Sequence, residues 1–153
     1  MEGQLSFGGD PVQFEQPIRP LHWVIKIGDL KRSIDLLTLL GARVLRHEEF
    51  TAGCEATCNG PYAGHWSKSM VGWDTEDVSF VFELTYNYGV YEYARGNDLG
   101  CVHLYKFNKD GEDMEAKMLA EFPEAQKNES TGVYHILKND FLFKFVDATA
   151  PGV

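Results

Sequence analysis

The chain has 153 residues, 44% of them hydrophobic and 13% aromatic, which suits one globular domain and excludes a disordered chain. Its formal net charge of −9 argues against nucleic acid or a membrane surface as a partner. No apolar run is long enough to span a membrane, and the first twenty residues lack the basic and apolar parts of a signal peptide. We therefore expect a cytoplasmic protein, with a mitochondrial location as the alternative.

A flexible tail is predicted over residues 1–19, which are polar and interrupted by Gly and Pro, and one domain over residues 20–150. In residues 21–27, LHWVIKI, apolar residues alternate with others, which predicts a strand. Asp29 is a good N-cap for a helix over residues 30–40. The apolar residues of this helix recur three and four positions apart, at Leu30, Ile34, Leu37 and Leu40.

Further strands complete this half of the chain, over residues 42–50, 67–73 and 79–87. Arg46, Glu48 and Glu49 are expected to form a solvated end of the first of these strands. A long loop over residues 51–66, rich in Gly and Asn, separates it from the next strand. The first half is therefore predicted to have the order β-α-β-β-β.

The same order of elements returns after residues 88–98. A strand is predicted over residues 100–107 and a helix from Met114 to Phe122, which stops near Pro123. A short strand within residues 124–132 is followed by strands over 133–138 and 141–147, joined by a turn at Asn139-Asp140. The fold class is therefore α+β, with two βαβββ modules.

Strand alternation separates an apolar face from a mixed face in each sheet. Phe80, Phe82, Leu84 and Tyr86 share the apolar face of one strand, and Phe141, Phe143 and Phe145 share that of another. We expect the apolar faces to pack beneath the helices and the two mixed faces to meet around a cavity. Its expected lining is His22, Val24, Lys26, Glu83, Thr85, Asn87, Cys101, His103, Tyr105, Leu142 and Lys144.

Several stretches resemble the glyoxalase domains of the vicinal-oxygen-chelate superfamily. ELTYNYG, over Glu83–Gly89, with the GVYEYARGND that follows it, resembles the fourth strand and linker of glyoxalase I, and VLRHEEF, CNGPY and WSKSMVG extend the match. It runs from Leu21 to Asp98, whereas from Leu99 to Val153 it rests on strand order. The resemblance implies a vicinal-oxygen-chelate fold, in which the sheets of paired βαβββ modules form a cup.

The resemblance also implies a divalent metal in the cup, held by one side chain from each of four strands. His22 and Glu83 stand at two ligand positions, and Glu83 is also the catalytic candidate. The third position is Cys101, with His103 two residues further on as a substitute. The fourth, usually Glu, is Lys144, whose cation opposes a metal. The expected cofactor is therefore either one divalent metal (Zn, Ni, Co, Mn or Fe) or none, with Glu83 paired to a lysine instead.

Lys26, Asn87 and Lys144 are the expected substrate-binding residues. Asn87 matches a residue that holds glutathione in the family, and Lys26 stands where the family has Arg. Two functions stay open. The first is a domain with a degenerate metal site that binds a small anionic metabolite or a partner. The second is a metal-dependent lactoylglutathione lyase-type lyase or isomerase acting on a glutathione hemithioacetal. The resemblance also implies a homodimer in which one chain completes the cup of the other.

Overall fold

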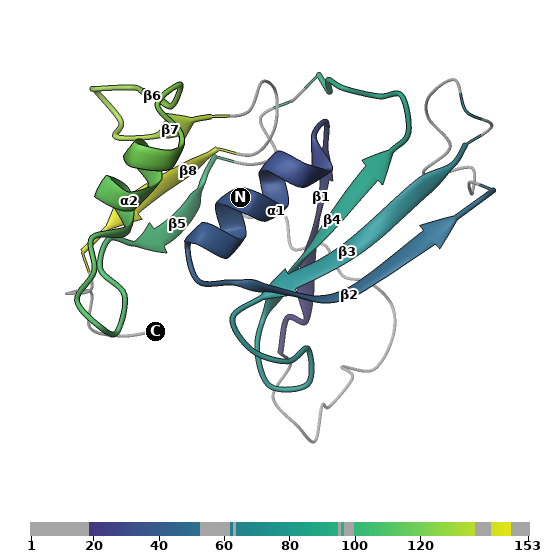
Figure 1. Ribbon diagram of the computed structural model, residues 1–153, viewed down its shortest axis with the longest axis horizontal. Helices are drawn as coiled ribbons and strands as arrows, with labels where there is room; N and C mark the ends of the chain where they lie inside the picture. Colours follow the sequence, from purple (N-terminus) through teal and green to yellow (C-terminus); the bar gives the residue numbers. More distant parts are fainter. Residues whose placement is uncertain are drawn as a thin grey trace, which may run out of the picture.

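The computed structural model describes residues 19–52, 62, 64–94, 96, 100–136 and 142–147 (Figure 1). This part of the chain folds into two four-stranded sheets, each with its own helix. The two βαβββ modules predicted from the sequence are thereby confirmed. Neither helix has the length and apolar character needed to cross a bilayer.

The first sheet has the strand order β1-β4-β3-β2. Its elements are β1 (His22–Ile27), α1 (Leu30–Leu39), β2 (Arg43–Phe50), β3 (Trp66–Gly72) and β4 (Val81–Asn87). β1 runs parallel to β4, and the other neighbours are antiparallel. β2 contains an irregularity between Val44 and Arg46, which pair with Val71 and Met70. This bulge places two residues that are two apart in sequence on opposite faces of the sheet.

α1 begins where the sequence predicts. The Asp29 carboxylate accepts a hydrogen bond from the Arg32 backbone N–H at 2.9 Å, and the Ser33 hydroxyl donates to the Asp29 carbonyl at 2.8 Å. These bonds satisfy groups that a helix end leaves unpaired. The helix ends before Gly41, whose φ of 89° lies in the left-handed region that glycine tolerates.

The second sheet has the order β5-β8-β7-β6 and shorter strands. Its elements are β5 (Val102–Tyr105), α2 (Met114–Glu121), β6 (Gln126–Lys127), β7 (Tyr134–His135) and β8 (Phe143–Val146). The short strand expected within residues 124–132 is present as β6. The predicted turn at Asn139-Asp140, residues 1–18 of the expected tail and most of the expected loop 51–66 lie outside the described residues.

Both modules share one hydrophobic core, and α1 lies between the two sheets in Figure 1. Leu37 and Leu40, on the predicted apolar stripe of α1, are buried. Leu36, outside that stripe, is only 1% exposed, and Leu39 packs against the same core. A helix that is apolar on more than one side is buried on more than one side, so α1 serves both modules.

A charged side chain of α1 also contacts residues that directly follow α2. The Arg32 guanidinium of α1 lies 4.2 Å from the centroid of the Phe122 ring at the end of α2, and it pairs with Glu124. As predicted, the apolar faces of the sheets supply Phe82, Leu84 and Phe143 to the core. Phe80, which directly precedes β4, is exposed and packs edge-on against Phe82. Phe141 lies outside the described residues.

Candidate functional site

The side of the first sheet opposite α1 carries most of the charged side chains that the sequence singles out. We call it the mixed face. Register and alternation place thirteen residues on it, namely His22, Val24, Lys26, Arg46, Glu48, Phe50, Trp66, Lys68, Met70, Val81, Glu83, Thr85 and Asn87. The residues between them in β1 and β4, such as Ile25 and Leu84, belong to the core.

Two of the expected metal ligands lie together on this face. His22 Nε2 is 3.5 Å from Glu83 Oε2, although they come from different strands, β1 and β4. The Glu83 side chain is 15% exposed and that of His22 is 39% exposed. A carboxylate and an imidazole this close together can ligate the same ion. Two of the expected ligand positions therefore lie within contact distance of each other.

The remaining expected ligands lie on the second sheet. His103 of β5 pairs in register with Lys144 of β8, and Cys101 directly precedes β5. Among the described residues, which include these three, no group of three or more His, Cys, Asp and Glu side chains could hold a metal ion. Within that part of the chain, His22 and Glu83 therefore supply two of the four ligands that the resemblance implies.

This result corrects the expectation that four strands of one chain surround a common hollow. The physical reason is the position of α1. Because α1 lies between the sheets and packs into a core common to both (Figure 1), the first sheet does not pair its mixed face with that of the second. Lys144 instead lies beside Gly132, where its Cε is 3.4 Å from the position that an added Cβ would take.

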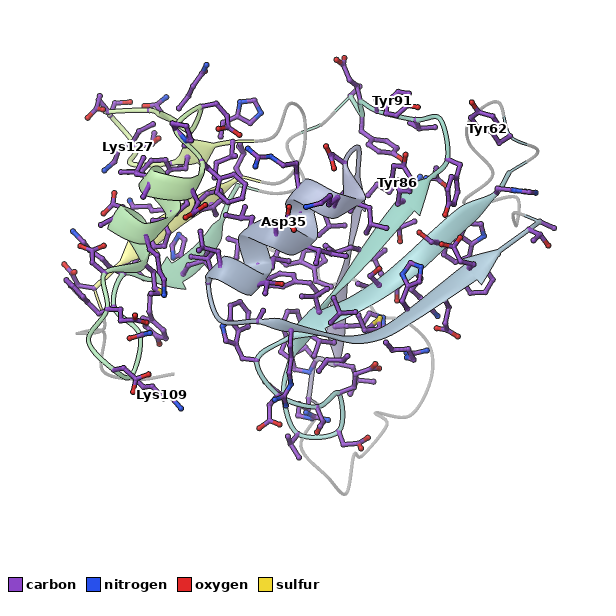
Figure 2. The ribbon with its side chains drawn as sticks, in the orientation of Figure 1. Asp35, Tyr62, Tyr86, Tyr91, Lys109 and Lys127 are labelled. Atoms are coloured by element: carbon purple, nitrogen blue, oxygen red, sulfur yellow. The ribbon has the colours of Figure 1, made fainter. Side chains whose placement is uncertain are left out.

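His103 faces a different feature, a groove of about 820 Å³ between the end of α1 and the second module. Trp73 and Tyr105 also line it, as does Lys109, which Figure 2 places at the outer end of the second module. None of the mixed-face residues lines this groove. His103 is therefore not a substitute ligand beside Glu83 in one chain.

Two of the three expected substrate-binding residues, Lys26 and Asn87, share the mixed face. Asn87 is fully buried, and its Nδ2 donates to the Tyr93 hydroxyl at 2.8 Å. The Lys26 ammonium lies 5.9 Å from the centroid of the same tyrosine ring, a cation–π distance. Asn87 Oδ1 and Trp66 Nε1, which belong to a register pair of β3 and β4, are both buried without a hydrogen-bond partner.

A network of ion pairs crosses the mixed face and was missed from the sequence. Arg46 donates to both carboxylate oxygens of Glu76, at 3.1 and 3.0 Å, and also contacts Glu48 at 2.5 Å. Lys68 lies 3.1 Å from the same Glu48 carboxylate. The hydrogen bond from Arg46 is the main cause that holds the pKa of Glu76 below its ordinary value. Arg46, Glu48 and Glu49, expected to form one solvated strand end, therefore lie on two faces of the sheet. Glu49 lies on the face opposite Arg46 and Glu48, where it contacts His47 and Tyr88.

No family model matches the chain. Over 85 residues, 55% of this chain, it is 56% identical to glyoxalase 1 of Caenorhabditis elegans. Over 81 residues it is 56% identical to glyoxalase domain-containing protein 4 of Rattus norvegicus. The matched residues make up 30% and 27% of those two proteins, so the chain spans less than a third of their length. It is also 39% identical to lactoylglutathione lyase of Escherichia coli O157:H7 over 57% of each chain.

The fold itself is found in solved structures. Glyoxalase I of Leishmania major superimposes with a TM-score of 0.59 and 26% identity, over 86% of this chain and 87% of that one. Glyoxalase I of Zea mays superimposes with a TM-score of 0.60 and 20% identity, over 86% of this chain and 45% of that one. About half of this chain is therefore similar to glyoxalase domain-containing protein 4, and the chain has the vicinal-oxygen-chelate fold of glyoxalase I.

Proposed function

We propose that the mixed face of the first sheet binds a small anionic metabolite and that its metal site is degenerate. The observation that carries this proposal is the incomplete ligand set. His22 contacts Glu83, but neither Cys101 nor His103 joins them among the described residues. Lys26 and Asn87, on the same face, provide an ammonium and an amide for an anionic group. The binding function therefore needs only residues that one chain brings together.

The names of the relatives suggest the class of metabolite to test first. Several of them are called glyoxalase or lactoylglutathione lyase. S-lactoylglutathione carries carboxylates, so it is an anionic ligand that Lys26 would attract. We infer that this chain binds it or a related glutathione-linked anion.

Isothermal titration calorimetry with S-lactoylglutathione tests the proposal. We expect saturable binding by the full chain that weakens about tenfold in Lys26→Met, because a hydrogen bond to a charged group is lost. Lys31→Met is the matched control, since Lys31 is an exposed residue of α1 that pairs with Asp35. Equal binding by both variants, or no binding by the unaltered chain, would contradict the proposal.

The second candidate is a metal-dependent lyase or isomerase acting on a glutathione hemithioacetal. The close contact of His22 with Glu83 favours it. Because the described residues of one chain bring together only these two ligands, we infer that a second copy supplies the others, and hence a homodimer. Light scattering at several concentrations tests for the dimer.

Metal analysis separates the two candidates. The lyase is supported by stoichiometric divalent metal in the purified protein and by turnover of methylglyoxal with glutathione, both lost in Glu83→Gln. A metal-free protein that stays inactive after Ni or Zn is added leaves the binding function. The lyase also predicts that a strictly monomeric chain is inactive.

A further inference from the structure

We propose that Tyr93 is a positioning residue, which fixes the two side chains of the mixed face that are expected to bind the metabolite, Lys26 and Asn87. The inference rests on the proposed function and goes beyond it, because Tyr93 lies in the linker between the modules and in neither sheet. One tyrosine side chain contacts both groups through different parts, its ring and its hydroxyl. This double contact carries the inference.

The chain turns back directly after β4. The Val90 N–H donates to the Asn87 carbonyl at 3.0 Å, and Gly89, between them, has a φ of 79°, in the left-handed region that glycine tolerates. The returning chain lies against the residue that follows β1, because a Cβ added to Gly28 would be 2.1 Å from the Tyr91 carbonyl oxygen. Two glycines therefore let the linker return to the strands of the mixed face.

The hydroxyl of Tyr93 holds the Asn87 amide. Asn87 is fully buried, and its Nδ2 donates to the Tyr93 hydroxyl oxygen at 2.8 Å. Asn87 Oδ1 has no hydrogen-bond partner among the described residues. Removing the Tyr93 hydroxyl would leave both ends of a buried amide unpaired, which costs free energy. The bond to Tyr93 is therefore expected to fix the orientation in which Asn87 meets a ligand.

The ring of Tyr93 restrains the Lys26 ammonium. Lys26 Nζ lies 5.9 Å from the ring centroid, within the range of cation–π attraction. A ring that restricts a lysine before the ligand arrives reduces the conformational entropy lost on binding. Thr85, the register partner of Lys26, is two residues before Asn87, so Lys26 and Asn87 are diagonal neighbours on one face. One tyrosine can therefore set the geometry of both.

Calorimetric titration of the full chain with S-lactoylglutathione tests the inference. We expect Tyr93→Phe to weaken binding about fivefold, since it loses only the hydrogen bond to Asn87. Tyr93→Leu, which loses the ring as well, should weaken binding by a further factor of about three. Tyr91→Phe is the matched control and should bind as the unaltered chain does, because the Tyr91 side chain is exposed and its backbone is what lies against Gly28.

A double-mutant cycle separates positioning from a general loss of structure. In the Lys26→Met background, Tyr93→Phe and Tyr93→Leu should bind S-lactoylglutathione equally, because the ring has no ammonium left to restrain. Both should still bind more weakly than Lys26→Met alone, because the bond to Asn87 is lost in each. A difference between the two that is as large without the ammonium as with it would overturn the inference.

Hydrogen exchange measured by NMR follows Asn87 without a ligand. In the ligand-free chain, Tyr93→Phe should speed the exchange of the Asn87 Nδ2 protons with water several-fold, whereas Tyr91→Phe should leave it unchanged. Unchanged exchange in Tyr93→Phe, or binding by Tyr93→Leu as tight as by the unaltered chain, overturns the inference and leaves the proposed function standing. No binding of S-lactoylglutathione by the unaltered chain would instead contradict the proposed function, and the inference with it.

Discussion

The Glu115 carboxylate should make the stability of the second module depend on acid. It accepts a hydrogen bond from the Tyr134 hydroxyl at 2.5 Å, and it pairs with Lys127 at 2.9 Å and with Lys106 at 3.3 Å. The bond from Tyr134 is the first cause that lowers the pKa of Glu115 from 4.5 to about 2, with burial opposing it. Figure 2 shows Lys127 at the outer edge of the second sheet. The cluster thus fixes α2 to β6 and β7.

The size of the effect follows from the change in pKa. A lowering from 4.5 to about 2 corresponds to about 3 kcal/mol of stability at pH 7, at about 1.4 kcal/mol for each pH unit. Because the folded-state pKa is the lower one, this stability is present above pH 4.5 and is lost as the pH falls toward 2. Solvent screening reduces this contribution, because the partner lysines, Lys127 and Lys106, are 37% and 34% exposed, although the Glu115 side chain itself is 16% exposed.

Urea unfolding of Glu115→Gln and of the unaltered chain at pH 7 and pH 3 measures this contribution. We expect the variant to be about 2 to 3 kcal/mol less stable at pH 7 and about 1 kcal/mol less stable at pH 3. Glu121→Gln, an exposed position on the same helix, is the matched control and should change little. A stability gap that is the same at both pH values would refute the reasoning.

Three further substitutions, one of them with Gly100→Ala as its control, test the fold by urea unfolding. Asp29→Ala should cost about 1 kcal/mol, because α1 loses its N-cap; no loss would mean that the cap does not stabilise the folded state. Gly28→Ala should be strongly destabilising, since the added Cβ would lie 2.1 Å from the Tyr91 carbonyl oxygen. Gly100→Ala is the control and should have a small effect, because nothing lies within 4 Å of its added Cβ. Equal losses of stability in the two variants would contradict the close approach of Gly28 to Tyr91. Leu37→Ala should cost about 2 to 5 kcal/mol, because Leu37 is 1% exposed, and a loss below 1 kcal/mol would mean that the site is not tightly packed.

The order of elements could be predicted because each depends on local patterns. Alternation in LHWVIKI and the N-cap at Asp29 are visible in the sequence, and both features are present in the structure. The contact between His22 and Glu83 was also accessible, since the family resemblance places both on one face. These predictions concern residues within one module, where strand periodicity and motif agree.

The relation between the modules could not be predicted from the same patterns. Alternation identifies which side chains share a face but not what that face packs against. The sequence did contain one indication that α1 packs on more than one side. Leu36 and Leu39 extend the apolar surface of the helix beyond its predicted stripe. The ion pairs of Arg46 were missed for another reason. The bulge in β2 separates Arg46 from Val44, and a rule of strict alternation cannot represent such a shift.

Because α1 is buried on more than one side, cutting the chain between the two modules should affect the folding of both. A fragment that ends after β4 would lose the second module's part of the common core, to which Leu36 belongs and against which Leu39 packs. A fragment that begins at β5 would lose the helix against which α2 packs. We therefore expect the two halves to melt in one cooperative transition. Separate expression of either half should yield an aggregating polypeptide, and mixing the two should restore the fold.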